Sequence, residues 1–363
     1  MSDIGKHPHH KTHQFRNVVQ HMRKSSQYKG WDNNKKGSIM DTTVEAPTVS
    51  YIGTVKLHGT FGGIVLHEDQ TISFHSKSQL LGFVDSSGDF TLNSDNAEFA
   101  QSMWRRFKGV VKTIGWAVES CKAHYGKIIY PIKISGEFCG VGIQKGVGVS
   151  YLPKKSFFVF GVKCGDINQD EKEGWLPLSI IRPVKSQEHH IYNIMDFTTE
   201  RITIDFNSPE ESQNVLVEAT EEVEKECPVS KALGVTESLL GEGLVWVPED
   251  PQYCYDNGNF FKTKGQKHSV SKVKSVAAVC PEKLNSIKEF VEYAATDNRL
   301  EQGVSEVGLD QKLTGQYIGW VNRDINKEEG DVLEENNLTM KDVGKKISDK
   351  ARKYYLDKLN SEF

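Results

Sequence analysis

The chain has 363 residues, of which 37% are hydrophobic and 26% charged, and its net charge is −4 at pH 7. This length predicts one large domain plus a smaller one, and the composition is that of an ordinary globular protein. No apolar run reaches the ~18–20 residues of a membrane span, and the N-terminus lacks the hydrophobic core of a secretory signal. We therefore expect a cytoplasmic protein with no membrane partner.

The first 45 residues are polar and rich in histidine. Apolar residues at helical spacing between Phe15 and Met22 predict a short helix there. The four histidines between residues 7 and 13 could capture a metal, but no cysteine or acidic ligand pattern accompanies them. We expect residues 1–45 to be a lead-in that packs on, or simply precedes, the catalytic domain.

From residue 46 the pattern changes to short β runs separated by turns, with two helical stretches between them. After residue 278 the strand signals fade and helical periodicity dominates. The chain is therefore predicted to be α+β, with antiparallel sheets and flanking helices in 46–278 and a small α-helical domain in 279–363. The expected strands are 51–57, 63–66, 71–74, 128–135, 157–162, 243–247 and 259–263, and the expected helices are 95–125, 209–227, 284–295, 313–321 and 343–359.

Lys56 stands at the end of an expected strand and begins the run Lys-Leu-His-Gly. A lysine amine can attack the α-phosphorus of ATP when its pKa is lowered, and nearby cations would lower it. Gly59 would let the backbone approach a nucleotide closely. Taken alone, the motif also fits an exposed lysine at a strand edge.

Two further segments carry groups suited to a nucleoside. Glu137 precedes a glycine-rich loop at residues 140–146, and a carboxylate there offers acceptors to ribose hydroxyls. In Phe-Phe-Val-Phe at 157–160, alternation puts Phe158 and Phe160 on one face, where one aromatic ring could stack on a purine. A solvent-facing glutamate and ordinary core packing are the alternatives.

Two later segments carry groups suited to metal and phosphate. Glu242 lies between glycines at the start of an apolar strand and can reach a divalent cation through water. Alternation sends Lys262 and Lys264 to the same face, which is costly unless an anion lies between them, so a triphosphate site is plausible. An ordinary turn glutamate and a solvated edge strand remain open as alternatives.

Together these five elements, in this order, resemble the covalent nucleotidyltransferases, the superfamily of polynucleotide ligases and capping enzymes. Within it the chain looks most like the RNA ligase 2 group of phage and related double-strand RNA ligases. The most specific mark is the Gly-Ile-Gln-Lys run that begins at Gly142, and His58 stands where DNA ligases usually have Asp. The resemblance covers residues 49–275 well and the C-terminal helices loosely.

The resemblance implies an ATP-dependent RNA ligase that joins 3′-hydroxyl and 5′-phosphate RNA ends, with Lys56 as the nucleophile that forms lysyl-AMP. Glu137 would hold the ribose, Phe160 would stack on adenine, and Glu242 would organise the metal, Mg²⁺ or in its place Mn²⁺. Lys77 falls where the family has a basic residue that contacts the nucleotide and the 5′-phosphate. The nucleotide-binding residues implied are Val55, Leu57, His58, Gly59, Lys77, Glu137, Phe160, Glu242, Lys262 and Lys264.

Three positions depart from the family pattern. Phe61 replaces an asparagine, Gly161 an acidic residue, and Val247 a lysine. We expect these changes to alter how the metal, pyrophosphate and the RNA end are bound.

We expect nicked duplex RNA as the partner, in RNA repair, and a monomer that works in the cytoplasm, the host's if a phage encodes it. The alternatives are a DNA ligase, a capping guanylyltransferase, or a non-catalytic RNA-end-binding protein derived from a ligase.

Overall fold

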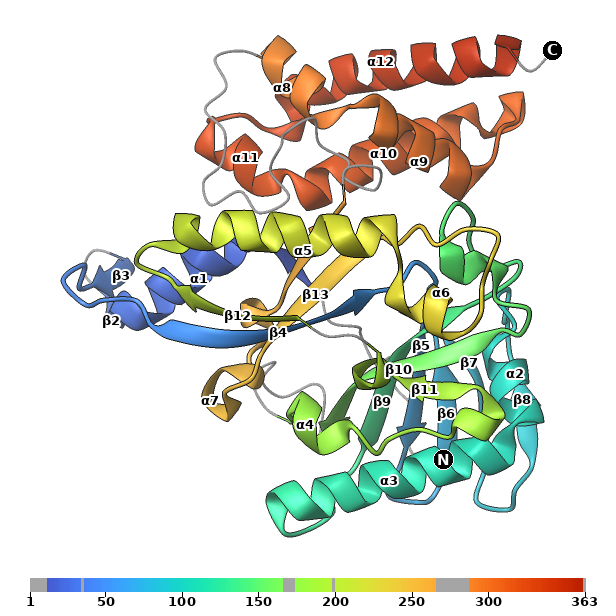
Figure 1. Ribbon diagram of the computed structural model, residues 1–363. Coiled ribbons are helices and arrows are strands. Elements are labelled where there is room, and N and C mark those ends of the chain that lie inside the picture. The colour runs from blue at the N-terminus through green and yellow to red at the C-terminus, as the bar shows by residue number, and fades with distance from the viewer. Residues whose placement is uncertain (1–11, 34–35, 166–173, 198–199, 266–286, 362–363) are drawn as a thin grey trace.

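The computed structural model describes residues 12–33, 36–165, 174–197, 200–265 and 287–361. Two β-sheets form the centre of the molecule, and five helices form a separate layer above them (Figure 1). This is the mixed α+β architecture predicted from the sequence, with antiparallel-rich sheets, flanking helices and a helical C-terminal region. None of the described helices has the length and hydrophobicity that a bilayer-spanning segment requires.

The first sheet has five strands in the order β1-β14-β13-β4-β12. All neighbours in it are antiparallel except β1 and β14, which run parallel. It is built from β1 (His13–Gln14), β4 (Thr48–Lys56), β12 (Glu200–Asp205), β13 (Gly243–Pro248) and β14 (Phe261–Lys264).

The second sheet has seven strands in the order β11-β10-β9-β5-β6-β7-β8. Its neighbours are antiparallel apart from the parallel pair β10 and β11. Its members are β5 (Thr60–Leu66), β6 (Ile72–His75), β7 (Leu80–Val84), β8 (Phe90–Leu92), β9 (Ile132–Cys139), β10 (Ser156–Cys164) and β11 (Ile191–Asn193), and a separate hairpin joins β2 (Tyr28–Asp32) to β3 (Gly37–Met40).

The segment Leu57–Gly59 carries the chain from the last residue of β4, in the first sheet, to β5, in the second. Lys56 therefore lies at the junction of the two sheets. Strand β9 begins at residue 132, later than the predicted 128, and continues to Cys139. Glu137 is consequently inside a strand rather than at its end.

Helices cover the outer faces of both sheets. On the seven-stranded sheet, α2 (Phe99–Arg105) and α3 (Phe107–Tyr125) replace the single helix predicted over 95–125. Arg106 interrupts it with φ −114° and ψ 30°, and Trp104 stacks on Phe90 of β8 with ring centroids 4.9 Å apart. The five-stranded sheet is covered by α1 (Phe15–Gln27) and α5 (Gln213–Lys225).

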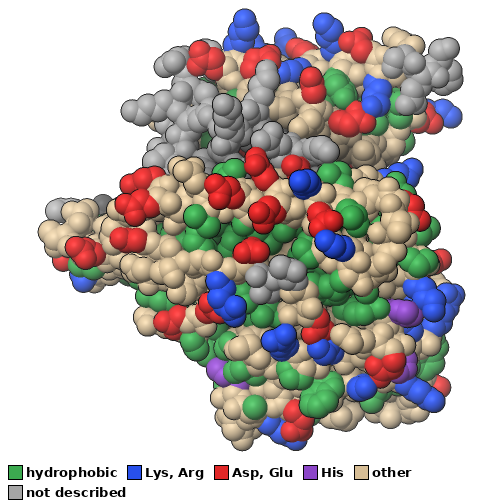
Figure 2. All heavy atoms as spheres, in the orientation of Figure 1, with side chains coloured by type: hydrophobic (Ala, Val, Ile, Leu, Met, Phe, Trp, Pro, Cys, Tyr) green, Lys and Arg blue, Asp and Glu red, His purple; other side chains and the backbone are tan. Residues whose placement is uncertain are grey.

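The N-terminal helix belongs to this core. The apolar residues that predicted it from their spacing, Phe15 to Met22, are all buried against the five-stranded sheet. The predicted acidic helix is α5, preceded by a 3₁₀ turn at Pro209–Ser212. Figure 2 shows acidic side chains gathering along α5, below the C-terminal layer. Shorter helices are α4 (Leu178–Ile181), α6 (Pro228–Ala232) and α7 (Pro251–Cys254).

The C-terminal helices have a hydrophobic core of their own, centred on residues such as Tyr317 and Tyr355, whose rings stack at 4.3 Å. We call α8–α12 the helical unit. The predicted helix at 313–321 is the first half of α10, while α9 and α11 were missed. The unit consists of α8 (Ile287–Ala294), α9 (Asp297–Val307), α10 (Thr314–Glu328), α11 (Gly330–Glu335) and α12 (Met340–Ser361).

Candidate active site

Strand register brings the predicted site residues into one row. Gly243 of β13 pairs with Lys56 of β4 on one side and with Lys264 of β14 on the other. Glu242 precedes this row, so its carboxylate lies between the two lysines. Gly243 has φ +144°, and a Cβ there would come within 2.1 Å of the Thr263 carbonyl oxygen. Only glycine fits, which explains the Glu-Gly pair in the motif.

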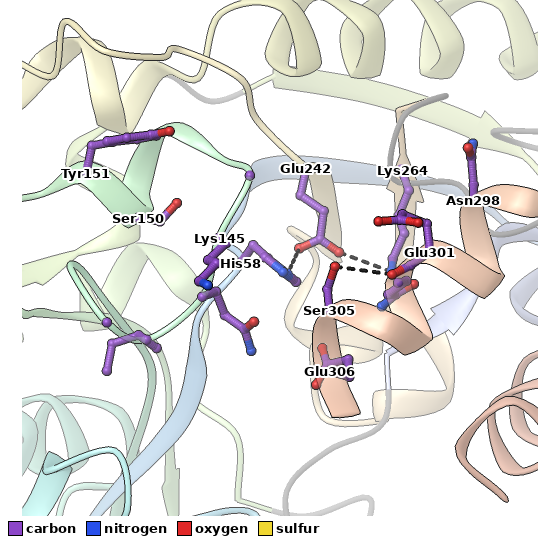
Figure 3. A pocket seen from close by; sticks show the side chains of 15 residues that line it. His58, Lys145, Ser150, Tyr151, Glu242, Lys264, Asn298, Glu301, Ser305 and Glu306 are labelled. Carbon is purple, nitrogen blue, oxygen red and sulfur yellow. Dashed lines mark hydrogen bonds and ion pairs between the residues drawn. The ribbon is translucent and has the colours of Figure 1, made fainter. Parts of the chain in front are cut away.

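Glu242 is the centre of the charge network (Figure 3). Lys56 Nζ donates to its Oε2 at 2.7 Å, Lys264 Nζ lies 3.1 Å from its Oε1, and His58 Nδ1 is 3.5 Å from Oε2. Burial by itself would raise the pKa of Glu242, but Lys56 and Lys264, with His58, outweigh it and hold the pKa well below its ordinary value. The carboxylate is therefore charged at neutral pH. Cations were expected around Lys56, and the structure adds a buried anion among them.

Glu137 is held in a different state. Its Oε1 accepts a hydrogen bond from the Gly59 amide at 3.0 Å, and a Cβ on Gly59 would come within 2.4 Å of the Phe138 carbonyl oxygen. Burial is the largest effect and, with the Glu242 charge, raises the pKa of Glu137 to about 7, although Lys56 opposes it. Environments that push apart the pKa values of two nearby carboxyl groups are typical of sites that handle protons or charged ligands.

Glu137→Gln should make the unliganded protein more stable than the wild type at pH 8 and change its stability little at pH 4. In the unfolded chain a glutamate ionises near pH ~4.3, whereas the folded pKa is about 7. The folded state thus retains a proton that the unfolded state releases, and wild-type stability falls as pH rises between these values. Glutamine keeps the acceptor for Gly59 and does not titrate.

Urea unfolding of both proteins at several pH values measures this difference. Glu119→Gln, at an exposed pair with Lys122 on α3, is the matched control and should show no pH-dependent gain. A Glu137→Gln difference that stays constant from pH 4 to 8 would contradict the buried-carboxyl interpretation.

An inner cavity of about 140 Å³ lies beside Lys56, between the sheets. Val55, Leu57 and Phe160 line it, as does Glu137 at its polar end. Phe158 also lines it but packs against Tyr192 at 5.3 Å, whereas Phe160 is only partly buried. A register shift between Val159 and Gly161 interrupts the regular alternation of side chains along β10, next to Phe160. The apolar walls suit a flat base, with the Lys56 end open to charged groups.

Two of the three departures form part of this cavity, and the third lies beside it. The Gly161 position faces Trp175, whose Cζ3 would be 2.6 Å from a Cβ there. The acidic side chain of the family pattern therefore has no room. Phe61 lies 6.3 Å from the Phe160 ring and beneath the Lys133 ammonium, and Val247 lines the same cavity. The departures make this region more aromatic and apolar than the family pattern.

An outer cavity of about 550 Å³ opens on the other side of Glu242. The loop at 142–146 and Tyr151 line one wall, and α9 lines the other through Asn298 and Glu306 (Figure 3). His58, Glu242 and Lys264 lie at its inner end. A molecule that approaches Lys56 from this side would contact both the two β-sheets and the helical unit.

Three predicted site residues line neither cavity: Gly59, Lys262 and Lys77. Lys262 faces the helical unit, where its Nζ is 3.0 Å from Glu328 Oε2. Lys77 is exposed in the turn between β6 and β7, so the structure does not bring it into the cluster around Glu242. Sequence reasoning missed Glu328, Trp175 and the α9 residues, and no local pattern pointed to them. Lys267, Lys272 and Lys274, which continue the basic sequence after Lys264, lie outside the described residues.

The donor set can be tested for the expected divalent cation. Glu242 and Glu137 are the carboxylates beside Lys56, and the described residues contain no cluster of three or more acidic, histidine or cysteine side chains that could enclose a metal ion. Mg²⁺ commonly keeps several waters and takes one or two carboxylates together with substrate phosphates. These residues fit that mode of binding and not a dedicated protein cage.

No family model matches the sequence, and no curated protein matches it. Among solved structures the chain is similar to RNA ligase from Naegleria gruberi: a mutant with AMP and Mn (14% identity, TM-score 0.41) and the ligase with PPi (14%, 0.38). A second mutant, with ATP and Mn, gives 13% and 0.41. Each match covers 72% of this chain and 58% of the other, so the chain spans less than two thirds of their length.

Proposed function

We propose that the protein is an ATP-dependent RNA ligase that carries AMP on Lys56. The observation that carries this proposal is the row of Lys56, Glu242 and Lys264 at the mouth of an apolar cavity that ends on Glu137. In this proposal the adenine base packs against Phe160 and the ribose lies at Glu137. This pose directs the phosphates to the lysines.

In the first step Lys56 Nζ attacks the α-phosphorus of ATP. A nitrogen–phosphorus bond forms, the bond from the α-phosphorus to the bridging oxygen breaks, and pyrophosphate leaves with that oxygen. The ammonium must first lose a proton to solvent, and Glu242 Oε2, which accepts a hydrogen bond from Lys56 Nζ at 2.7 Å, orients the amine. Lys264 then balances charge on the phosphates, because phosphoryl transfer relies mainly on positioning and electrostatics.

In the second step a 5′-phosphate oxygen of RNA attacks the lysyl-AMP phosphorus, the nitrogen–phosphorus bond breaks, and Lys56 Nζ takes up a proton from solvent and leaves as the free amine. The product is an RNA end capped by AMP through a pyrophosphate bridge. In the third step the 3′-hydroxyl attacks the RNA 5′-phosphorus, loses its proton, and AMP leaves. Mg²⁺ held by Glu242 would supply charge neutralisation for the phosphates.

The RNA end would reach Lys56 through the outer cavity, and the helical unit forms one wall of that cavity. Because this wall adds surface beside the reacting end, we propose nicked duplex RNA as the preferred substrate. A nicked RNA duplex should be sealed at least about tenfold faster than a single strand of the same sequence. Equal rates would contradict the duplex preference but leave the adenylylation chemistry intact.

The alternatives make different predictions in the same assay. A capping enzyme would take its label from GTP in preference to ATP, and a DNA ligase would seal a nick with a DNA 3′-hydroxyl strand. A non-catalytic RNA-end-binding protein would bind the nick without gaining a nucleotide.

A further inference from the structure

Lys262 contacts an anion that the protein itself supplies. On β14, Lys262 and Lys264 are both half-buried, while Phe261 and Thr263 are buried, so the two lysines share a face. Lys264 pairs with the carboxylate of Glu242. Lys262 Nζ instead lies 3.0 Å and 3.2 Å from the two carboxylate oxygens of Glu328, at the last residue of α10. Each lysine of the predicted phosphate-binding pair is therefore occupied by a carboxylate.

The Lys262–Glu328 pair is shielded from solvent, since the side chains are 12% and 11% exposed. Salt screens such a pair less than it screens a surface contact. Burial lowers the pKa of Lys262 to about 8, the Glu328 charge opposes this, and the positive charges of Lys264 and Lys56 lower it further. Three lysines of the site therefore lie close enough to interact. A cluster of cations of this kind needs anions, and either Glu328 or phosphate oxygens can provide them.

The backbone at Glu328 is held in place by the N-terminal segment. The Gln14 side chain donates to the Glu328 carbonyl oxygen at 2.8 Å, and Arg16 donates to the same oxygen at 3.2 Å. Arg16 also pairs with Glu329 at 3.1 Å and with Asp331. The carboxylate on Lys262 is thus part of the contact through which the helical unit is seated on the five-stranded sheet.

We propose that Glu328 competes with phosphate for Lys262. The Glu328 carboxylate and the phosphates of ATP or pyrophosphate bind Lys262 in alternation. Nucleotide binding therefore weakens the contact between α10 and the five-stranded sheet. This inference rests on the proposed function for the identity of the nucleotide. The competition itself needs only an anion of phosphate type. By linkage, the contact between α10 and the sheet weakens phosphate binding by the same factor as phosphate binding weakens that contact.

The test is the affinity of the full chain for inorganic pyrophosphate with Mg²⁺, measured by titration calorimetry, because this probe needs no covalent chemistry. Glu328→Gln removes the charge and keeps the shape, and it should tighten pyrophosphate binding on the order of tenfold. Glu334→Gln is the matched control: Glu334 is exposed on α11, and its change should leave the affinity within about twofold. In a Lys262→Met background, Glu328→Gln should have no further effect.

A second measurement uses the wild type and so does not depend on the folding of any variant. Saturating pyrophosphate should speed amide hydrogen exchange in the last turns of α10 and in β1, because the Glu328 contact is displaced. Unchanged or slower exchange there would overturn the proposal, as would an unchanged or weaker affinity in Glu328→Gln.

These outcomes are separate from those of the proposed function. If the wild type gains AMP but Glu328→Gln binds pyrophosphate no more tightly than the wild type, the competition is wrong and the ligase assignment stands. If Glu328→Gln binds more tightly while the wild type never gains AMP, the competition holds for a phosphate site of another enzyme. If no form of the protein binds pyrophosphate, the competition is overturned.

Discussion

Lys56→Ala should abolish the transfer of label from ATP to the protein, with a loss on the order of a thousandfold or more. Among the described residues of this cluster, Lys264 pairs with the other oxygen of the Glu242 carboxylate and Lys262 faces Glu328, so we expect neither to replace Lys56. The alanine variant should still fold, since the Lys56 side chain is only partly buried at the end of β4. The measurement is labelled ATP with Mg²⁺, followed by denaturing gel electrophoresis.

Two control variants sharpen this result. Lys56→Arg keeps the positive charge beside Glu242 but lacks a nucleophilic amine, and it should be as inactive as alanine. Lys112→Ala removes an exposed lysine that pairs with Glu188 on the surface, and its labelling should equal that of the wild type. Label on either Lys56 variant would show that another residue is the nucleophile.

Glu329→Gln should destabilise the contact between the helical unit and the N-terminal segment by about 3–5 kcal/mol. Glu329 is 1% exposed and accepts from three groups: Arg16 Nη2 at 3.1 Å, Arg299 Nη2 at 2.9 Å and the Tyr293 hydroxyl at 3.0 Å. The side chains of Arg16 and Arg299 are 4% and 0% exposed. Removing the negative charge of Glu329 leaves two buried guanidinium groups with less compensating charge. Their less compensated burial is what makes the change costly in free energy.

Hydrogen exchange across α8–α12 as a function of urea measures this effect without assuming that the whole chain unfolds in one transition. Glu292→Gln breaks a pair with Lys350 in which Glu292 is 51% exposed, and it should cost less than about 1 kcal/mol. If the two variants have similar effects, the buried network does not hold the helical unit in place.

The sequence was informative about elements with strong periodicity. The buried apolar face of α1 and the continuous burial of Tyr51 to Val55 in β4 follow directly from the residue pattern. Helix α9 escaped prediction because it carries few apolar residues. It packs instead through Gly303, where a Cβ would come within 2.9 Å of the Tyr317 ring. A helix that packs through a glycine shows no regular spacing of apolar residues from which it could be predicted.

The candidate site was predictable where the chemistry needs a local combination of residues. Gly243 must follow Glu242 because β14 leaves no space for a side chain, and such pairs are visible in sequence. The contact between Lys262 and Glu328 spans 66 residues, and that between Arg16 and Glu329 spans 313. A glutamate at the end of a polar helix looks solvent-exposed from sequence alone, so only the packing of the helical unit shows its partner.

The most direct measurement is the intact mass of the purified full-length protein after incubation with Mg²⁺ and each ribonucleoside triphosphate in turn. We expect ATP to add the mass of one adenylyl group. Peptide mapping should place it on Lys56, and nicked RNA carrying a 5′-phosphate should remove it. A protein that gains no nucleoside monophosphate from any of the four, or that gains it at a residue other than Lys56, would contradict this assignment.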